Sequence, residues 1–138
     1  MATIAVIQSQ FSILNEEPRR LTGFSKQVHQ KFFGVLVEES GHTVHTAKTL
    51  DDYQQKGYEK PDIVICAPFP EIGNPAPGFV EIQRLQETFG DTPLIVWSTR
   101  TEESIRQSVL NDYGAKEYYR GTLLDAPDDF ADMVLKYT

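Results

Sequence analysis

Short apolar runs alternate with amphipathic segments along the chain, and this alternation limits the folds open to it more than any other feature. Three runs are continuous and rich in β-branched residues, as is typical of parallel strands covered on both faces: Ile4–Ile7, Ile63–Cys66 and Leu94–Trp97. Two others, Thr43–Thr46 and Glu117–Tyr119, mix polar and apolar residues, as strands at a sheet edge do. The sequence therefore predicts three central strands and two edge strands.

Helical periodicity separates the predicted strands. The apolar stripes consist of Val28, Phe32, Val35 and Leu36, then Phe79, Ile82, Leu85 and Phe89, then Ile105, Val109 and Tyr113. We also expect a short helix over residues 50–56 after Thr49, a capping box formed by Thr99 and Glu102, and a last helix from near Pro127. Right-handed crossovers put helices on both sheet faces. The sequence thus predicts one flavodoxin-like, doubly wound α/β domain over residues 1–138, with a five-stranded parallel sheet in the order 2-1-3-4-5.

Composition narrows the classes of partner. The chain has 13 basic and 20 acidic residues, a net charge of -7, and no basic run longer than Arg19-Arg20, so we expect neither nucleic-acid nor membrane binding. No apolar stretch approaches the roughly 20 residues that span a bilayer, and no signal peptide is visible. The single cysteine cannot form an internal disulfide. A cytoplasmic protein is expected.

Ligands of such folds bind at the carboxyl ends of the strands, so residues that follow the predicted strands are the candidates for function. A long segment, Gln10–Phe24, follows the first strand, and four prolines stiffen the loop after the third. His29, His42 and His45 show no spacing typical of a metal site, so we interpret them as surface residues and expect no metal or other cofactor. Cys66 is expected to be a buried, unreactive side chain.

Three segments, taken in order, resemble the CheY-like receiver domain of two-component response regulators: Pro61–Cys66, Pro93–Glu103 and Gly114–Tyr119. The similarity extends over nearly the whole chain. In receivers, two acidic residues after the first strand hold Mg²⁺, an aspartate ending the third strand accepts the phosphoryl group, and a lysine after the fifth strand neutralises its oxygens. The resemblance places Gln8, Ser9, Ala67 and Gly121 at these positions.

These four residues lack the chemistry of phosphoryl transfer. That reaction needs a nucleophile and cations that offset charge on the transferred oxygens, and neutral Gln8 and Ser9 are weak ligands for a hard divalent ion. Asp62 precedes Ala67 by five residues, which is about 16 Å along a strand, so it is expected at the opposite end of the sheet. The resemblance therefore implies a degenerate phosphorylation site.

The resemblance also assigns a switch pair. Ser98 matches the hydroxyl residue that ends the fourth strand of receivers, and Tyr118 matches the aromatic residue of the fifth strand that changes rotamer with it. Their retention without an acceptor indicates an output face that is frozen or differently triggered. The alternative is that Ser98 caps the next helix and that Tyr118 is only an aromatic residue of an edge strand.

Aromatic side chains are concentrated around the fourth helix and fifth strand, as is typical of protein interfaces. The predicted interaction surface consists of Ile105, Val109, Tyr113, Tyr118 and Tyr119. Receiver-like domains often pair through the fourth helix, fifth strand and fifth helix, which makes a homodimer one interpretation. The alternative is that one or two of these residues belong to the core, Tyr113 first among them.

These observations lead to a phosphorylation-independent pseudo-receiver that acts through protein contacts in a signalling pathway. Because the sequence ends just after the predicted fifth helix, we expect it to act through a separate protein partner, unless it is a fragment of a longer protein. An alternative is a flavodoxin-like regulatory domain that binds a small molecule in the emptied pocket, with help from Gln10–Phe24. No constellation of catalytic residues can be assembled from the strand ends, so we do not expect an enzyme.

Overall fold

The structure, a computed structural model, contains the predicted parallel sheet. It describes residues 2–7, 41–69, 73–98, 100–120, 132–134 and 136–137. The strands are β1 (Thr3–Ile7), β2 (Thr43–Ala47), β3 (Ile63–Cys66), β4 (Leu94–Trp97) and β5 (Glu117–Tyr119). They form one sheet in the order β2-β1-β3-β4-β5, and every pair is parallel. The predicted fold class and strand order are confirmed, with the apolar strands in the centre.

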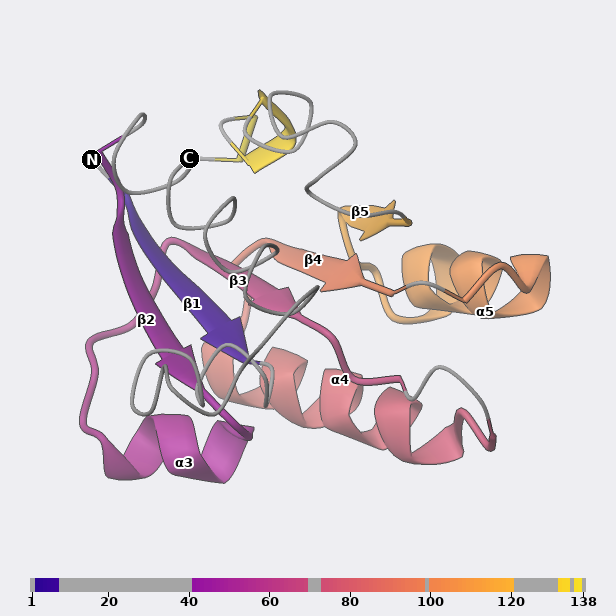
Figure 1. Ribbon diagram of the computed structural model, residues 1–138, viewed down its shortest axis with the longest axis horizontal. Helices are drawn as coiled ribbons and strands as arrows, with labels where there is room; N and C mark the ends of the chain where they lie inside the picture. Colours follow the sequence, from indigo (N-terminus) through magenta and orange to yellow (C-terminus); the bar gives the residue numbers. More distant parts are fainter. Residues whose placement is uncertain are drawn as a thin grey trace, which may run out of the picture.

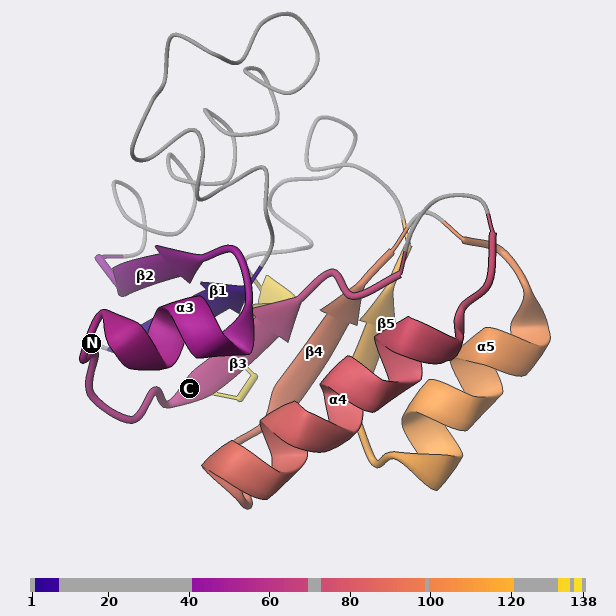
Figure 2. The ribbon, with the colours of Figure 1, turned by 90° about the horizontal axis from the view of Figure 1, so that it is seen from below.

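The described helices that follow β2, β3 and β4 lie on one face of the sheet (Figure 1, Figure 2). They are α3 (Leu50–Gln55), α4 (Ala76–Phe89), and α5 (Glu103–Gln107), which continues into the π-helical segment η3 (Ser108–Asp112). Residues 132–134 are also helical and lie on the other face. The stripe around Val28 and the helix start near Pro127 lie outside the described residues. Of the helices that are described, none has the length and apolar character needed to span a bilayer.

The ends of the helices follow the local sequence only in part. Thr49 is the N-cap of α3 and its side chain accepts a hydrogen bond from the Asp52 amide, as expected. The predicted capping box was wrong, because α5 begins at Glu103 and Glu102 itself occupies the N-cap position without a side-chain hydrogen bond. Thr99 lies outside the described residues. The next segment is π-helical, with the Tyr113 amide donating to the Ser108 carbonyl five residues earlier, at 3.1 Å.

Each strand supplies side chains to both faces, so two hydrophobic cores flank the sheet. The core under α3, α4, α5 and η3 contains Val64, Cys66, Val96 and Tyr118 from the sheet, with Ile82, Leu85, Ile105 and Val109 from the helices. The core on the opposite face contains Ile63, Ile65, Ile95, Trp97 and Val134. Tyr118 and Tyr119 are adjacent on β5 and consequently pack on opposite faces.

Candidate functional site

The candidate site lies at the carboxyl edge of the sheet, and Ala67 is near its centre. Ala67 is the first residue after β3, and its amide donates a hydrogen bond of 3.3 Å to the carbonyl of Ile7, the last residue of β1. The preceding residue, Cys66, is paired with Ile7 on one side and Val96 on the other. This is where the resemblance places the phosphoacceptor. A methyl group at this point supplies no nucleophile.

Cys66, next to this position, does not supply a nucleophile either. It is only 1% exposed, and burial raises the pKa of its thiol, with a further contribution from the negative charge of Glu81. A thiol of this kind stays protonated and inert near neutral pH. The prediction that Cys66 is buried is confirmed.

Asp62 and Asp51, two of the acidic residues that the structure describes, have other partners. Asp62 is at the amino end of the sheet, where its Oδ2 accepts a 2.8 Å hydrogen bond from the Thr3 amide. On α3, Asp51 pairs with Arg84 at 2.7 Å. Over the described ranges, no three His, Cys, Asp or Glu side chains are grouped so that they could hold a metal ion. Gln8, Ser9, Gly121 and Gln10–Phe24 lie outside those ranges.

Aromatic packing fills the loop that leaves Ala67. Phe69 lies so close to Gly78 that a Cβ added there would be 2.3 Å from the Phe69 ring. The Phe69 ring contacts Phe79 edge-on with centroids 5.0 Å apart, and Phe79 stacks on Tyr113 at 5.3 Å. This row of rings links the loop after β3, helix α4 and the end of η3.

The two residues that the resemblance assigns to a switch pair are both buried at the carboxyl end of the sheet. Ser98 is 7% exposed and Tyr118 is 9% exposed. The Ser98 amide donates to the Tyr119 carbonyl at 3.0 Å, which extends the pairing of β4 with β5 by one residue. The Ser98 hydroxyl oxygen accepts a 3.1 Å hydrogen bond from the Arg100 amide, and the Tyr118 hydroxyl donates to the Arg100 carbonyl at 3.0 Å. Both side chains are therefore hydrogen-bonded to the backbone of the same loop residue, Arg100.

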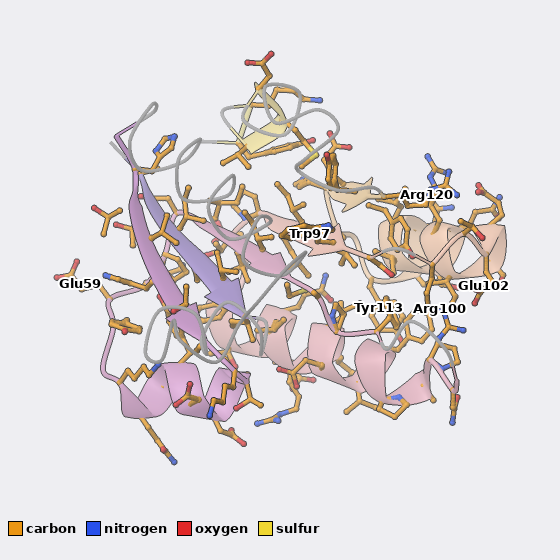
Figure 3. The ribbon with its side chains drawn as sticks, viewed as in Figure 1. Glu59, Trp97, Arg100, Glu102, Tyr113 and Arg120 are labelled. Atoms are coloured by element: carbon orange, nitrogen blue, oxygen red, sulfur yellow. The ribbon has the colours of Figure 1, made fainter. Side chains whose placement is uncertain are left out.

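Arg100, which the sequence did not single out, also connects two loops through its side chain. Its guanidinium donates to the carbonyl of Gly73, in the loop between β3 and α4, at 2.8 Å. The same group pairs with the Glu102 carboxylate through Nε at 3.0 Å and NH2 at 2.7 Å. Figure 3 shows Arg100 and Glu102 at the α5 end of the sheet, together with Arg120, whose guanidinium contacts the Thr101 carbonyl at 3.4 Å.

The predicted interaction surface needs correction. Ile105 is 4% exposed and Val109 is fully buried, because their stripe faces the sheet; these two residues are core. Tyr118 is also buried, and Tyr113 is half-buried against Phe79. Tyr119 is half-buried on the other face, edge-on to Trp97. The five residues do not form one continuous surface.

One histidine was also placed wrongly. His42 is 7% exposed, and its Nδ1 accepts a hydrogen bond from the Ala2 amide at 3.3 Å. The ring of His45 is half-buried and stacked on Tyr58 at 4.1 Å. These are packed residues of the β2 edge, and His29 lies outside the described residues.

Comparison with known structures gives the same architecture. The response regulator TrrA from Thermotoga maritima, in complex with Mg²⁺–BeF, is 19% identical with a TM-score of 0.61, over 100% of both chains. A response regulator receiver domain protein from Clostridium thermocellum is 17% identical with a TM-score of 0.66, over 99% of this chain and 94% of that one. The chemotaxis protein CheY4 of Vibrio cholerae is 17% identical with a TM-score of 0.64, over 100% and 99%.

This chain has the receiver-domain fold. At these identities the likeness concerns the fold alone, since one fold supports many functions. No protein-family model and no curated protein matches the sequence. The receiver-like features of its chemistry must therefore be judged from the residues at the site.

Proposed function

We propose that this protein is a pseudo-receiver, a non-catalytic signalling module of the cytoplasm that acts through protein contacts without being phosphorylated. The observation that carries the proposal is the position of Ala67. It directly follows β3, hydrogen-bonded to the end of β1, where the receiver resemblance places an aspartate.

The side chains that the sequence places around Ala67 support the same conclusion. Phosphoryl transfer depends on a nucleophile and on cations that neutralise the transferred oxygens. The resemblance places neutral Gln8 and Ser9 where receivers have acidic Mg²⁺ ligands, and Gly121 where they have a lysine. The nearest thiol, Cys66, is buried and protonated, and Asp62 is engaged at the other end of the sheet.

Retention of the switch pair supports an output through protein contact. Ser98 and Tyr118 are held in the arrangement described above although the acceptor is missing. The partner would bind the surface around α5 and β5. A second copy of the chain is one such partner. The exposed residues there include Glu103, Gln107 and Arg120, so such an interface is polar rather than the apolar one predicted from the sequence.

The direct test is intact-mass measurement after incubation with Mg²⁺ and acetyl phosphate. The mass is expected to stay unchanged under conditions that phosphorylate an authentic receiver domain. If neither the acidified sample nor the native sample contains a phosphoryl adduct, the result agrees with the proposal. A phosphoryl adduct on any carboxylate would refute it, and peptide mapping would then identify the acceptor.

The homodimer is tested separately by sedimentation. If copies pair through α5 and β5, the Arg106→Glu variant raises the dimer dissociation constant, because it reverses the charge of a residue on α5. Lys60→Glu is the matched control, since it changes the net charge by the same two units at an exposed residue between α3 and β3. A dimer weakened equally by both changes, or by neither, would contradict this choice of surface.

A further inference from the structure

Arg100 contacts both members of the switch pair through its backbone. Its amide donates to the Ser98 hydroxyl oxygen and its carbonyl accepts from the Tyr118 hydroxyl. The position of the Tyr118 ring therefore depends on where the loop places the Arg100 peptide groups. An interaction that restrains the Arg100 backbone therefore also restrains the Tyr118 hydroxyl.

The side chain of Arg100 supplies such an interaction. It is only 9% exposed although it carries a charge, and a buried charge is stable only where it is paired and hydrogen-bonded. The planar guanidinium satisfies this requirement with the Glu102 carboxylate on one side and the Gly73 carbonyl on the other. It thus connects residues 27 positions apart in the sequence.

The contact with Gly73 joins two loops at the carboxyl edge of the sheet. Gly73 belongs to the loop that begins at Ala67, whereas Ser98 and Glu102 belong to the loop that leaves β4. The guanidinium therefore joins the loop after β3, where the resemblance places the phosphoacceptor, to the loop after β4, which carries Ser98. The backbone of Gly73 has φ of 113°, a conformation that favours glycine.

We propose that Arg100 is a conformational clamp that holds the switch pair of this protein in a single arrangement, with Tyr118 buried, in the absence of any signal. The guanidinium fixes the loop after β4 against the loop after β3, and the Arg100 carbonyl then retains the Tyr118 hydroxyl. This clamp goes beyond the proposed function and does not depend on it, since it would act whether or not the chain accepts a phosphoryl group.

The clamp is tested by fluorine NMR of the full chain with 3-fluorotyrosine incorporated only at position 118. The wild type is expected to give one narrow resonance. Arg100→Ala is expected to give a second or broadened resonance, because the loop no longer fixes the carbonyl that holds the hydroxyl. Arg106→Ala is the matched control, since it removes a guanidinium that pairs with Glu103 in the next turn.

Hydrogen exchange provides a second readout that distinguishes clamping from general destabilisation. In Arg100→Ala, the hydrogen-bonded amides of residues 100 and 76, one in each loop, are expected to exchange about tenfold faster or more, while those of β1 and β3 are unchanged. If Arg100→Ala does not fold, Arg100→Lys replaces it, because lysine keeps the charge but lacks the planar fork. A single wild-type resonance in the folded variant, or faster exchange in only one of the two loops, would overturn the clamp.

Discussion

Two corners of the carboxyl edge are built on different principles. The acceptor corner, formed by Ala67, Phe69, Gly78 and Phe79, is held by apolar packing of rings against a helix. The switch corner, formed by Ser98, Arg100, Glu102 and Tyr118, is held by hydrogen bonds and an ion pair. The corner where the resemblance places the phosphoacceptor is thus filled by partly buried rings that pack against the core, while the corner where it places the switch pair has a polar network.

The largest expected effect concerns access to the acceptor corner. Cys66 is buried beside Ala67, and burial raises the pKa of its thiol. A maleimide reagent at pH 8 should label the native protein several orders of magnitude more slowly than the urea-unfolded chain, because labelling requires an exposed thiolate. The measurement is the labelling rate by mass spectrometry.

The same thiol has a consequence for stability. Above its ordinary pKa of 9.0, Cys66 ionises in the unfolded chain but stays protonated in the folded one, so the free energy of unfolding should fall as pH rises. Cys66→Ala should reduce this slope.

In the labelling experiment, rapid reaction of the native protein would show that the acceptor corner is open and would contradict the difference between the two corners.

Gly78→Ala should break the packing of the acceptor corner. The new Cβ would be 2.3 Å from the Phe69 ring and 3.1 Å from the Pro68 carbonyl oxygen. Overpacking of this kind lowers the free energy of unfolding by about 1–3 kcal/mol, partly offset by the better helix propensity of alanine. Urea unfolding measures the change. In a Phe69→Ala background the same substitution should become neutral or stabilising. An unchanged loss in the free energy of unfolding there would mean that the contact with the Phe69 ring is not its cause.

Tyr118→Phe should weaken the switch corner by a smaller amount. The change removes the hydroxyl that bonds to the Arg100 carbonyl and keeps the buried ring, so the expected loss is about 1 kcal/mol. Tyr113→Phe is the matched control, because it retains the stack on Phe79. Equal effects of the two substitutions in urea unfolding would mean that the Tyr118 hydrogen bond has no special role.

The smallest effect is expected for Glu102→Gln. Glu102 is 48% exposed, so its pair with Arg100 should contribute no more than about 1 kcal/mol and should weaken as salt is added. Glu103→Gln, which removes the partner of Arg106 on the same helix, is the control. A large, salt-independent loss in Glu102→Gln alone would mean that the carboxylate, and not the Gly73 carbonyl, is the main attachment of the clamp.

Much of the fold could be predicted because its signals are local. The continuous apolar runs of β1, β3 and β4 distinguish central strands from the mixed runs of β2 and β5. The stripe of Ile105 and Val109 was read correctly as a helix face, but assigning the same residues to an interaction surface was wrong, since an apolar stripe packs inward.

The clamp could not be predicted, because it depends on a contact between distant loops. Nothing near Gly73 in the sequence indicates that its carbonyl accepts from Arg100. The only local sign is a charge pair two residues apart, Arg100 and Glu102, just before a helix. The π-helical segment was not predicted either. The spacing of four between Ile105, Val109 and Tyr113 is compatible with it but fits an α-helix equally well.

We propose that the switch pair is set without phosphorylation. This proposal is tested most directly by recording the fluorine resonance of 3-fluorotyrosine at position 118 before and after addition of Mg²⁺ and acetyl phosphate to the otherwise unaltered protein. One resonance at an unchanged position is the predicted result. A shift of that resonance, accompanied by a phosphoryl adduct in the intact mass, would contradict the account and show that the chain still works as a phosphorylated receiver.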